Sequence, residues 1–200
     1  MRQTPRATAF VVVVMSMSLL VACSGDAKFV STGSVTTTTN EPTTTTSVPC
    51  SSTDATTDAK TGGSTVMDVS LLTDVRTGLQ PCSDRVTFEF RNGVTPEYRI
   101  EYESGPFSFG ESGMPVTIQG SAFLVVVFPH ASGFDLTDPA ATASYTGPES
   151  IIPTGLTHVA EVRRIEDFEA VLRWVIGLDT ARPFTVGVLD GPPRVYLDFS

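Results

Sequence analysis

The sequence predicts an all-β fold, an antiparallel β-sandwich with long loops, and three observations support this prediction. Residues 86–90, 98–102 and 195–199 each alternate between apolar and polar side chains. A period of two is typical of strands that bury one face. Turn-forming residues border these segments, as at Asn92-Gly93 and Gly191-Pro192-Pro193. The longest apolar run after the N-terminal region, residues 122–128, has the length of a buried strand.

The first 22 residues have the layout of a secretory signal peptide: Arg2 and Arg6, then an uncharged run, then Cys23. The stretch 20–23, Leu-Val-Ala-Cys, resembles the lipobox of bacterial lipoproteins. This resemblance implies cleavage before Cys23, acylation of its thiol with lipid such as palmitate, and attachment to the outer face of the cell membrane. The alternative, an uncleaved anchor helix over residues 11–21, is short for a membrane span.

Residues 23–64 are rich in Ser and Thr, including two runs of four threonines, and predict a flexible, disordered tether. Such tracts can carry O-linked sugars. Outside the cytoplasm, the two cysteines other than Cys23, Cys50 and Cys82, are expected to form a disulfide that fixes the end of the tether to the domain. Two reduced thiols are the alternative.

Residues 65–200 are expected to form one domain, since some 135 residues suffice for a single core. The predicted strands, in order, are residues 70–76, 86–90, 98–102, 116–118, 122–128, 157–163, 184–189 and 195–199. Between His130 and Pro153 the composition predicts a long surface loop with at most a helical turn over residues 138–144.

Residues 166–178 fit two patterns. As an amphipathic helix they would bury Phe168, Leu172 and neighbouring apolar residues. As a strand they would place Phe168, Leu172 and Trp174 on one side and Glu169 on the other. We favour the strand because its alternation matches the neighbouring segments, and we assign Trp174 to the core.

Removal of residues 1–22 leaves 11 Lys and Arg against 22 Asp and Glu. An acidic surface repels phosphate backbones, which argues against nucleic acid as a partner. We predict no metal and no other cofactor, since His130 and His158 have no ligand spacing with Cys or Glu.

No catalytic residues are predicted, because the sequence has no Gly-x-Ser-x-Gly, no Ser-x-x-Lys and no phosphate-cradling loop. We therefore expect a protein that is not an enzyme. Carboxylates along the strands are interpreted as a solvated face: Glu101, Glu103, Glu161 and Glu169. Sugar binding requires exposed aromatic rings beside polar groups, and the candidates for this role are Tyr145, Tyr196, Arg85, Arg99 and Arg194.

The order of the segments at 84–90, 98–102, 176–179 and 192–199, with its Pro-Pro-Arg before the last strand, resembles the AMIN and AMIN-like domains of bacterial envelope proteins, including actinobacterial lipoproteins. The resemblance spans residues 71–199. It implies a β-sandwich and a non-catalytic module that binds peptidoglycan, another cell-wall glycan or an envelope partner. A scaffold for another envelope protein and a carrier of an apolar ligand are the alternative functions.

Overall fold

The computed structural model describes residues 54–65, 68–110 and 112–200. It contains thirteen strands: β1 (Lys60–Gly62), β2 (Ser70–Gln80), β3 (Ser83–Arg91), β4 (Tyr98–Tyr102), β5 (Phe107–Phe109), β6 (Met114–Val116), β7 (Ala122–Phe128), β8 (Ala131–Ser132), β9 (Ser150–Ile151), β10 (Val159–Phe168), β11 (Val171–Leu178), β12 (Phe184–Leu189) and β13 (Arg194–Phe199). The signal peptide, Cys23 and Cys50 lie outside the described residues, so acylation and the pairing of Cys50 with Cys82 stay predictions.

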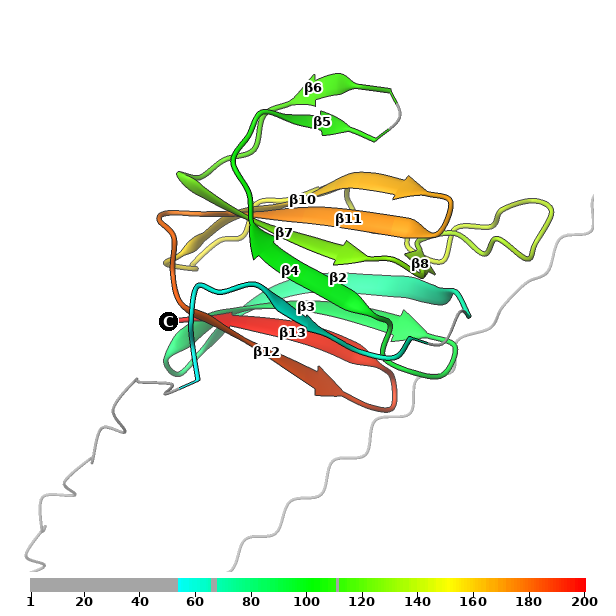
Figure 1. Cartoon of the computed structure of the whole chain (residues 1–200), viewed down its shortest axis with the longest axis horizontal. Helices are drawn as coiled ribbons and strands as arrows, with labels where there is room; N and C mark the ends of the chain where they lie inside the picture. The colour runs from blue at the N-terminus through cyan, green and yellow to red at the C-terminus, as the bar shows by residue number, and fades with distance from the viewer. Residues whose placement is uncertain (1–53, 66–67, 111) are drawn as a thin grey trace, which may run out of the picture. The chain divides into compact units, whose positions relative to one another are not determined.

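Two sheets form the domain, and the all-β prediction is confirmed. One sheet has six strands in the order β1-β4-β7-β11-β10-β9, and the other has five in the order β12-β13-β3-β2-β8. Figure 1 shows them as two layers, with the separate hairpin β5–β6 beyond the six-stranded layer. All pairings within the two sheets are antiparallel except the short parallel contact between β2 and β8.

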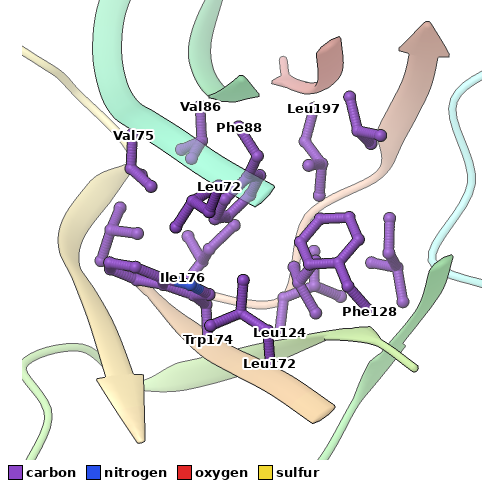
Figure 2. Packing of buried hydrophobic residues seen from close by; sticks show 14 of the residues in the cluster. Leu72, Val75, Val86, Phe88, Leu124, Phe128, Leu172, Trp174, Ile176 and Leu197 are labelled. Atoms are coloured by element: carbon purple, nitrogen blue, oxygen red, sulfur yellow. The ribbon is translucent and has the colours of Figure 1, made fainter. Parts of the chain in front are cut away.

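The core lies between these two layers. Figure 2 shows Phe88 and Leu72 of the five-stranded sheet beside Phe128, Trp174 and their neighbours from the six-stranded sheet. The Phe88 ring meets the rings of Phe128 and Trp174 edge to face, at centroid distances of 5.2 and 5.9 Å. Edge-to-face contact places the positive edge of one ring against the negative face of another. Trp174 is fully buried and lies in the core as predicted.

A buried carboxylate connects a loop to this core. Asp84, at the start of β3, is 1% exposed. Its Oδ2 accepts hydrogen bonds from the backbone N–H groups of Thr157, His158 and Val159 at 2.9, 2.5 and 3.1 Å. Because an unpaired buried carboxylate is costly, these three donors fix the loop before β10 against β3.

The outer face of the six-stranded sheet carries a second apolar cluster. Ile118, Val125, Ile165 and Val175 are buried there, packed against partly buried residues that include Phe107 of the β5–β6 hairpin. The hairpin therefore covers part of this face (Figure 1). This arrangement explains why residues 122–128 are apolar on both sides of their strand.

Residues 166–178 form strands rather than a helix, but they are not one continuous strand. The end of β10 and the start of β11 are joined by Glu169 and Ala170, whose φ angles are +48° and +61°. Two consecutive positive φ values are the geometry of a two-residue hairpin turn. Phe168, expected on the buried side, is consequently 52% exposed next to this turn.

Two further expectations need correction. The segment β1 lies within the range assigned to the tether, and it pairs with β4, so the sheet begins before residue 65. Glu161, expected on a solvated face, is 4% exposed. Its carboxylate accepts hydrogen bonds from the Gln119 N–H and the Ser150 hydroxyl at 2.8 and 2.7 Å. These two hydrogen bonds offset the cost of removing the Glu161 carboxylate from water.

The long segment between His130 and Pro153 is tied closely to the domain. It contributes β8 and β9, and residues 138–144 form turns without a helix. Ser144 donates from its hydroxyl to the Leu72 carbonyl at 2.8 Å, and Asp167 accepts from the Ser132 hydroxyl at 2.8 Å. Within the described ranges, no helix has the length and apolarity needed to cross a membrane.

Candidate functional site

A groove on the outer face of the five-stranded sheet is the candidate site. The register aligns Tyr196 of β13 with Thr87 of β3 and with Gly187 of β12, and aligns Thr87 with Arg76 of β2. Side chains from four adjacent strands therefore gather on one surface. The hollow between them has a volume of about 270 Å³. It is lined by Arg76, Thr77, Gly78, Gln80, Arg85, Thr87, Leu189, Arg194 and Tyr196.

Arg85 is held in the groove by a carboxylate and an aromatic ring. Its Nε and Nη2 donate to Asp198 at 2.6 and 2.7 Å, a two-point contact between neighbouring strands. The guanidinium carbon lies 4.0 Å from the centre of the Tyr196 ring. The hydrogen bonds with Asp198 raise the pKa of Arg85 above its already high value. Arg85 and Tyr196 thus form one rigid, permanently cationic unit.

Arg76, on β2, is held by two carboxylates, those of Asp74 and Glu89. Its Nη1 donates to Asp74 at 2.7 Å and its Nη2 lies 3.0 Å from Glu89. The hydrogen bonds to Asp74 and Glu89 raise the pKa of Arg76. The acidic partners of Arg76 do not line the hollow, so they fix the guanidinium at its edge.

Arg194 differs from both, because it has no acidic partner among the residues that the structure describes. Its register partner is Glu89, but the carboxylate of Glu89 pairs with Arg76 instead. Arg194 donates from Nε to the Pro192 carbonyl at 3.2 Å. Among the described residues, no carboxylate oxygen lies within 4.0 Å of its guanidinium. This cation is therefore the one in the groove best placed to accept an external anion.

Two glycines shape the surface around Tyr196. A Cβ on Gly187 would lie 2.2 Å from Cζ of the Tyr196 ring, so the ring occupies the space that a side chain would fill. A Cβ on Gly78, the register partner of Arg85, would meet nothing within 4 Å. The ring therefore packs over β12 while the surface above β2 stays open.

The groove unites three of the five predicted ligand residues: Tyr196, Arg85 and Arg194. Arg99 lies on the other sheet, on β4, where it pairs with Glu101 at 3.2 Å. Tyr145 was wrongly expected at the surface, since it is 5% exposed.

Three contacts explain the burial of Tyr145. Its ring packs edge to face on Trp174 at 5.7 Å, and its hydroxyl donates to the Pro148 carbonyl at 2.8 Å. The guanidinium of Arg164 lies 5.8 Å from the ring centre. These contacts place Tyr145 in the core, although the composition between His130 and Pro153 predicted a long surface loop.

The sequence interpretation missed Arg76, Gln80 and Thr87 in the groove. Arg76 is the last residue of the predicted strand at 70–76, and the sequence interpretation gave it no role. Only the pairing of β2 with β3, which includes a bulge between Leu72 and Asp74, brings it beside Arg85. A bulge shifts all later residues of a strand relative to its neighbour, and the sequence gives no clear sign of this one.

The two histidines lie near single carboxylates. The Nδ1 of His130 is 3.8 Å from Glu97, and the Nδ1 of His158 is 3.6 Å from Asp179. In residues 54–65, 68–110 and 112–200, no group of three or more His, Cys, Asp and Glu side chains is placed to hold a metal ion.

Comparison with known families decides what kind of domain carries this groove. The family model of the AMIN-like domain matches residues 70–200, from the first residue of β2 to the end of the sequence. The chain belongs to the AMIN-like domain family. This match confirms the resemblance to the AMIN-like domain, and it covers all strands except β1. Comparisons with curated proteins and with solved structures give no match.

The AMIN-like domain is associated with the cell wall and the cell envelope, which is an extracytoplasmic location. The groove lies within the matched region, because all nine lining residues fall between positions 76 and 196. It is therefore a surface of the AMIN-like domain itself.

Proposed function

We propose that this protein is a non-catalytic lipoprotein of the cell envelope whose AMIN-like domain binds cell-wall glycan in the groove around Tyr196. The N-terminal lipid on Cys23 would hold it at the outer face of the cell membrane, and the Ser/Thr-rich segment would give the domain reach into the wall. The lipobox and the tether composition support this arrangement.

The convergence of Arg85, Arg194 and Tyr196 carries the proposal. These residues come from two segments more than 100 positions apart, and they meet in one hollow. Sugars present hydroxyl groups together with apolar C–H faces. Guanidinium N–H groups can bind the former, and the partly exposed Tyr196 ring can contact the latter.

The wall-binding proposal is tested with the full chain and isolated cell walls in a sedimentation assay. We expect the wild-type chain to sediment with walls and the Tyr196→Ala chain to lose most of that binding. Tyr98→Ala is a poor control because Tyr98 packs against the core. Thr117→Ala, at an exposed loop position, is a better one and should bind as the wild type does. Failure of the wild-type chain to sediment would reject the wall-binding function.

The anchor is tested separately by fractionating cells that express the full chain or Cys23→Ala. We expect the wild-type chain in the membrane fraction and the variant outside it. The variant lacks the thiol that would carry the lipid, and stable attachment requires two or more acyl chains. Equal membrane association of the two would contradict acylation at Cys23.

A scaffold for another envelope protein remains the second candidate. The sequence motifs alone support it as well as they support glycan binding, but the cationic groove favours the glycan. A carrier of an apolar ligand is less favoured, since large apolar side chains such as Phe88, Phe128 and Trp174 pack against one another between the layers (Figure 2).

A further inference from the structure

The charge around the groove points to a more specific ligand than a neutral sugar. The whole chain has a formal net charge of −9, yet three arginines border this single hollow. Cations that lie close together repel one another unless carboxylates hold them or a ligand neutralises them. Arg76 and Arg85 have carboxylate partners, whereas Arg194 has none among the described residues.

The free donors of Arg194 define what it can bind. Its Nε is used by the Pro192 carbonyl, which fixes the stem of the guanidinium. The two Nη groups form no hydrogen bond within the described residues, so they remain available as a pair. Two parallel N–H donors match the two oxygens of a carboxylate or of a phosphate.

We propose that Arg194 binds an anionic oxygen group, a carboxylate or a phosphate, carried by the wall polymer, while Tyr196 contacts the attached sugar. This inference rests on the proposed function, because it names the chemistry that the same groove selects. Arg85 acts differently: Asp198 and the Tyr196 ring hold its guanidinium, so Arg85 positions the ring.

Arg194→Gln tests the charge directly, since it keeps the length and a hydrogen-bond donor but removes the cation. Arg99→Gln is the matched control, because Arg99 is 60% exposed on the other sheet. We expect Arg194→Gln to weaken sedimentation of the full chain with walls about tenfold, and Arg99→Gln to leave it unchanged. Wild-type binding should also weaken as salt is raised, and the Arg194→Gln chain should show a smaller salt dependence.

Chemically modified walls distinguish the two sources of the anion. Walls from which phosphate polymers have been stripped with hydrofluoric acid test the phosphate. Walls whose carboxylates have been converted to amides with carbodiimide and ammonia test the carboxylate. Whichever treatment lowers wild-type binding should leave the already weak binding of Arg194→Gln unaltered. Undiminished wild-type binding to walls treated in both ways would overturn the proposal and leave the wall-binding function intact.

A probe without any wall separates failure of this inference from failure of the proposed function. The full chain is titrated with inorganic phosphate and with acetate while the Nε–Hε resonances of its arginines are followed by NMR. We expect the Arg194 signal to move with at least one anion and the Arg99 signal to stay in place. No response at Arg194, with wall binding preserved, would reject the anion site alone. A response at Arg194 without wall binding by the wild-type chain would reject the wall as its source.

Discussion

The outer face of the six-stranded sheet carries an apolar cluster partly covered by the β5–β6 hairpin, whereas the outer face of the five-stranded sheet presents three arginines and a tyrosine. Both faces belong to one sandwich and share one core. The chain itself covers part of the first face, and the apolar side chains buried there contribute to stability. The second leaves a hollow open to solvent, and its side chains are free to bind. The difference teaches that one outer face gathers cationic and aromatic side chains around a hollow, while the other buries apolar side chains under a hairpin.

The largest expected difference between the faces is in stability, and a matched pair of substitutions measures it. Ile165→Ala removes side-chain atoms from the covered cluster, where Ile165 is 4% exposed. Leu189→Ala removes the same number of atoms at the edge of the open groove, where Leu189 is 41% exposed. We expect Ile165→Ala to lower the free energy of unfolding by about 2–5 kcal/mol. Leu189→Ala should change it by less than about 0.5 kcal/mol.

Urea denaturation of the full chain gives both values. Equal losses in the two variants would show that the β5–β6 hairpin does not protect its face, and the comparison between the faces would fail. A change in the slope of the Ile165→Ala transition alone would indicate that the hairpin opens separately from the sandwich.

The alternation of residues predicted part of this difference. β13 alternates strictly, and β3 does so apart from the buried Thr87, as expected for strands with one polar face; that face is where Arg85, Arg194 and Tyr196 meet. The apolar run of β7 indicated burial on both sides. What covers its outer side could not be predicted, because β5 and β6 are only three residues long and too short to show a pattern.

Residues of the candidate site could be predicted from the sequence only where the alternation within their own strand determines which face they lie on. Tyr145 was misplaced because its burial depends on packing against Trp174, a contact between segments distant in sequence. Arg76 was missed because its neighbours depend on the register of β2 after a bulge. Strand pairing and long-range packing are tertiary properties that local periodicity does not encode.

A smaller effect is expected on the open face, where Arg85→Lys keeps the charge but changes its shape. Lysine cannot reproduce the two-point contact with Asp198 or the stacking on the Tyr196 ring. Both charged side chains are partly exposed, at 30% and 21%, so solvent weakens the pair. We expect a loss of about 1 kcal/mol in the free energy of unfolding.

Arg99→Lys on the other sheet is the control, and its unfolding free energy should match that of the wild type within about 0.5 kcal/mol. If Arg85→Lys were as stable as Arg99→Lys, the Arg85–Tyr196 unit would not be rigid. The groove would then form only when a ligand binds.

The smallest effect concerns the core between the two sheets, and it is a change in the free energy of unfolding with pH. Burial raises the pKa of the Tyr145 hydroxyl from 10.0 to about 12. The folded chain therefore holds this proton more tightly than the unfolded chain does. The contribution is fully present below about pH 10 and is lost as the pH rises toward 12, so unfolding becomes easier over that interval.

Tyr145→Phe removes this titration together with the hydrogen bond to the Pro148 carbonyl. We expect the variant to be less stable at neutral pH by about 1 kcal/mol or less, and to lose less stability than the wild type between about pH 10 and 12. Some alkaline decline should remain, because burial also raises the pKa of Tyr98 and of Tyr102. Parallel pH profiles for the variant and the wild type would mean that Tyr145 is accessible to solvent. Tyr145 would then again be a candidate for contact with a sugar, at a place away from the groove around Tyr196.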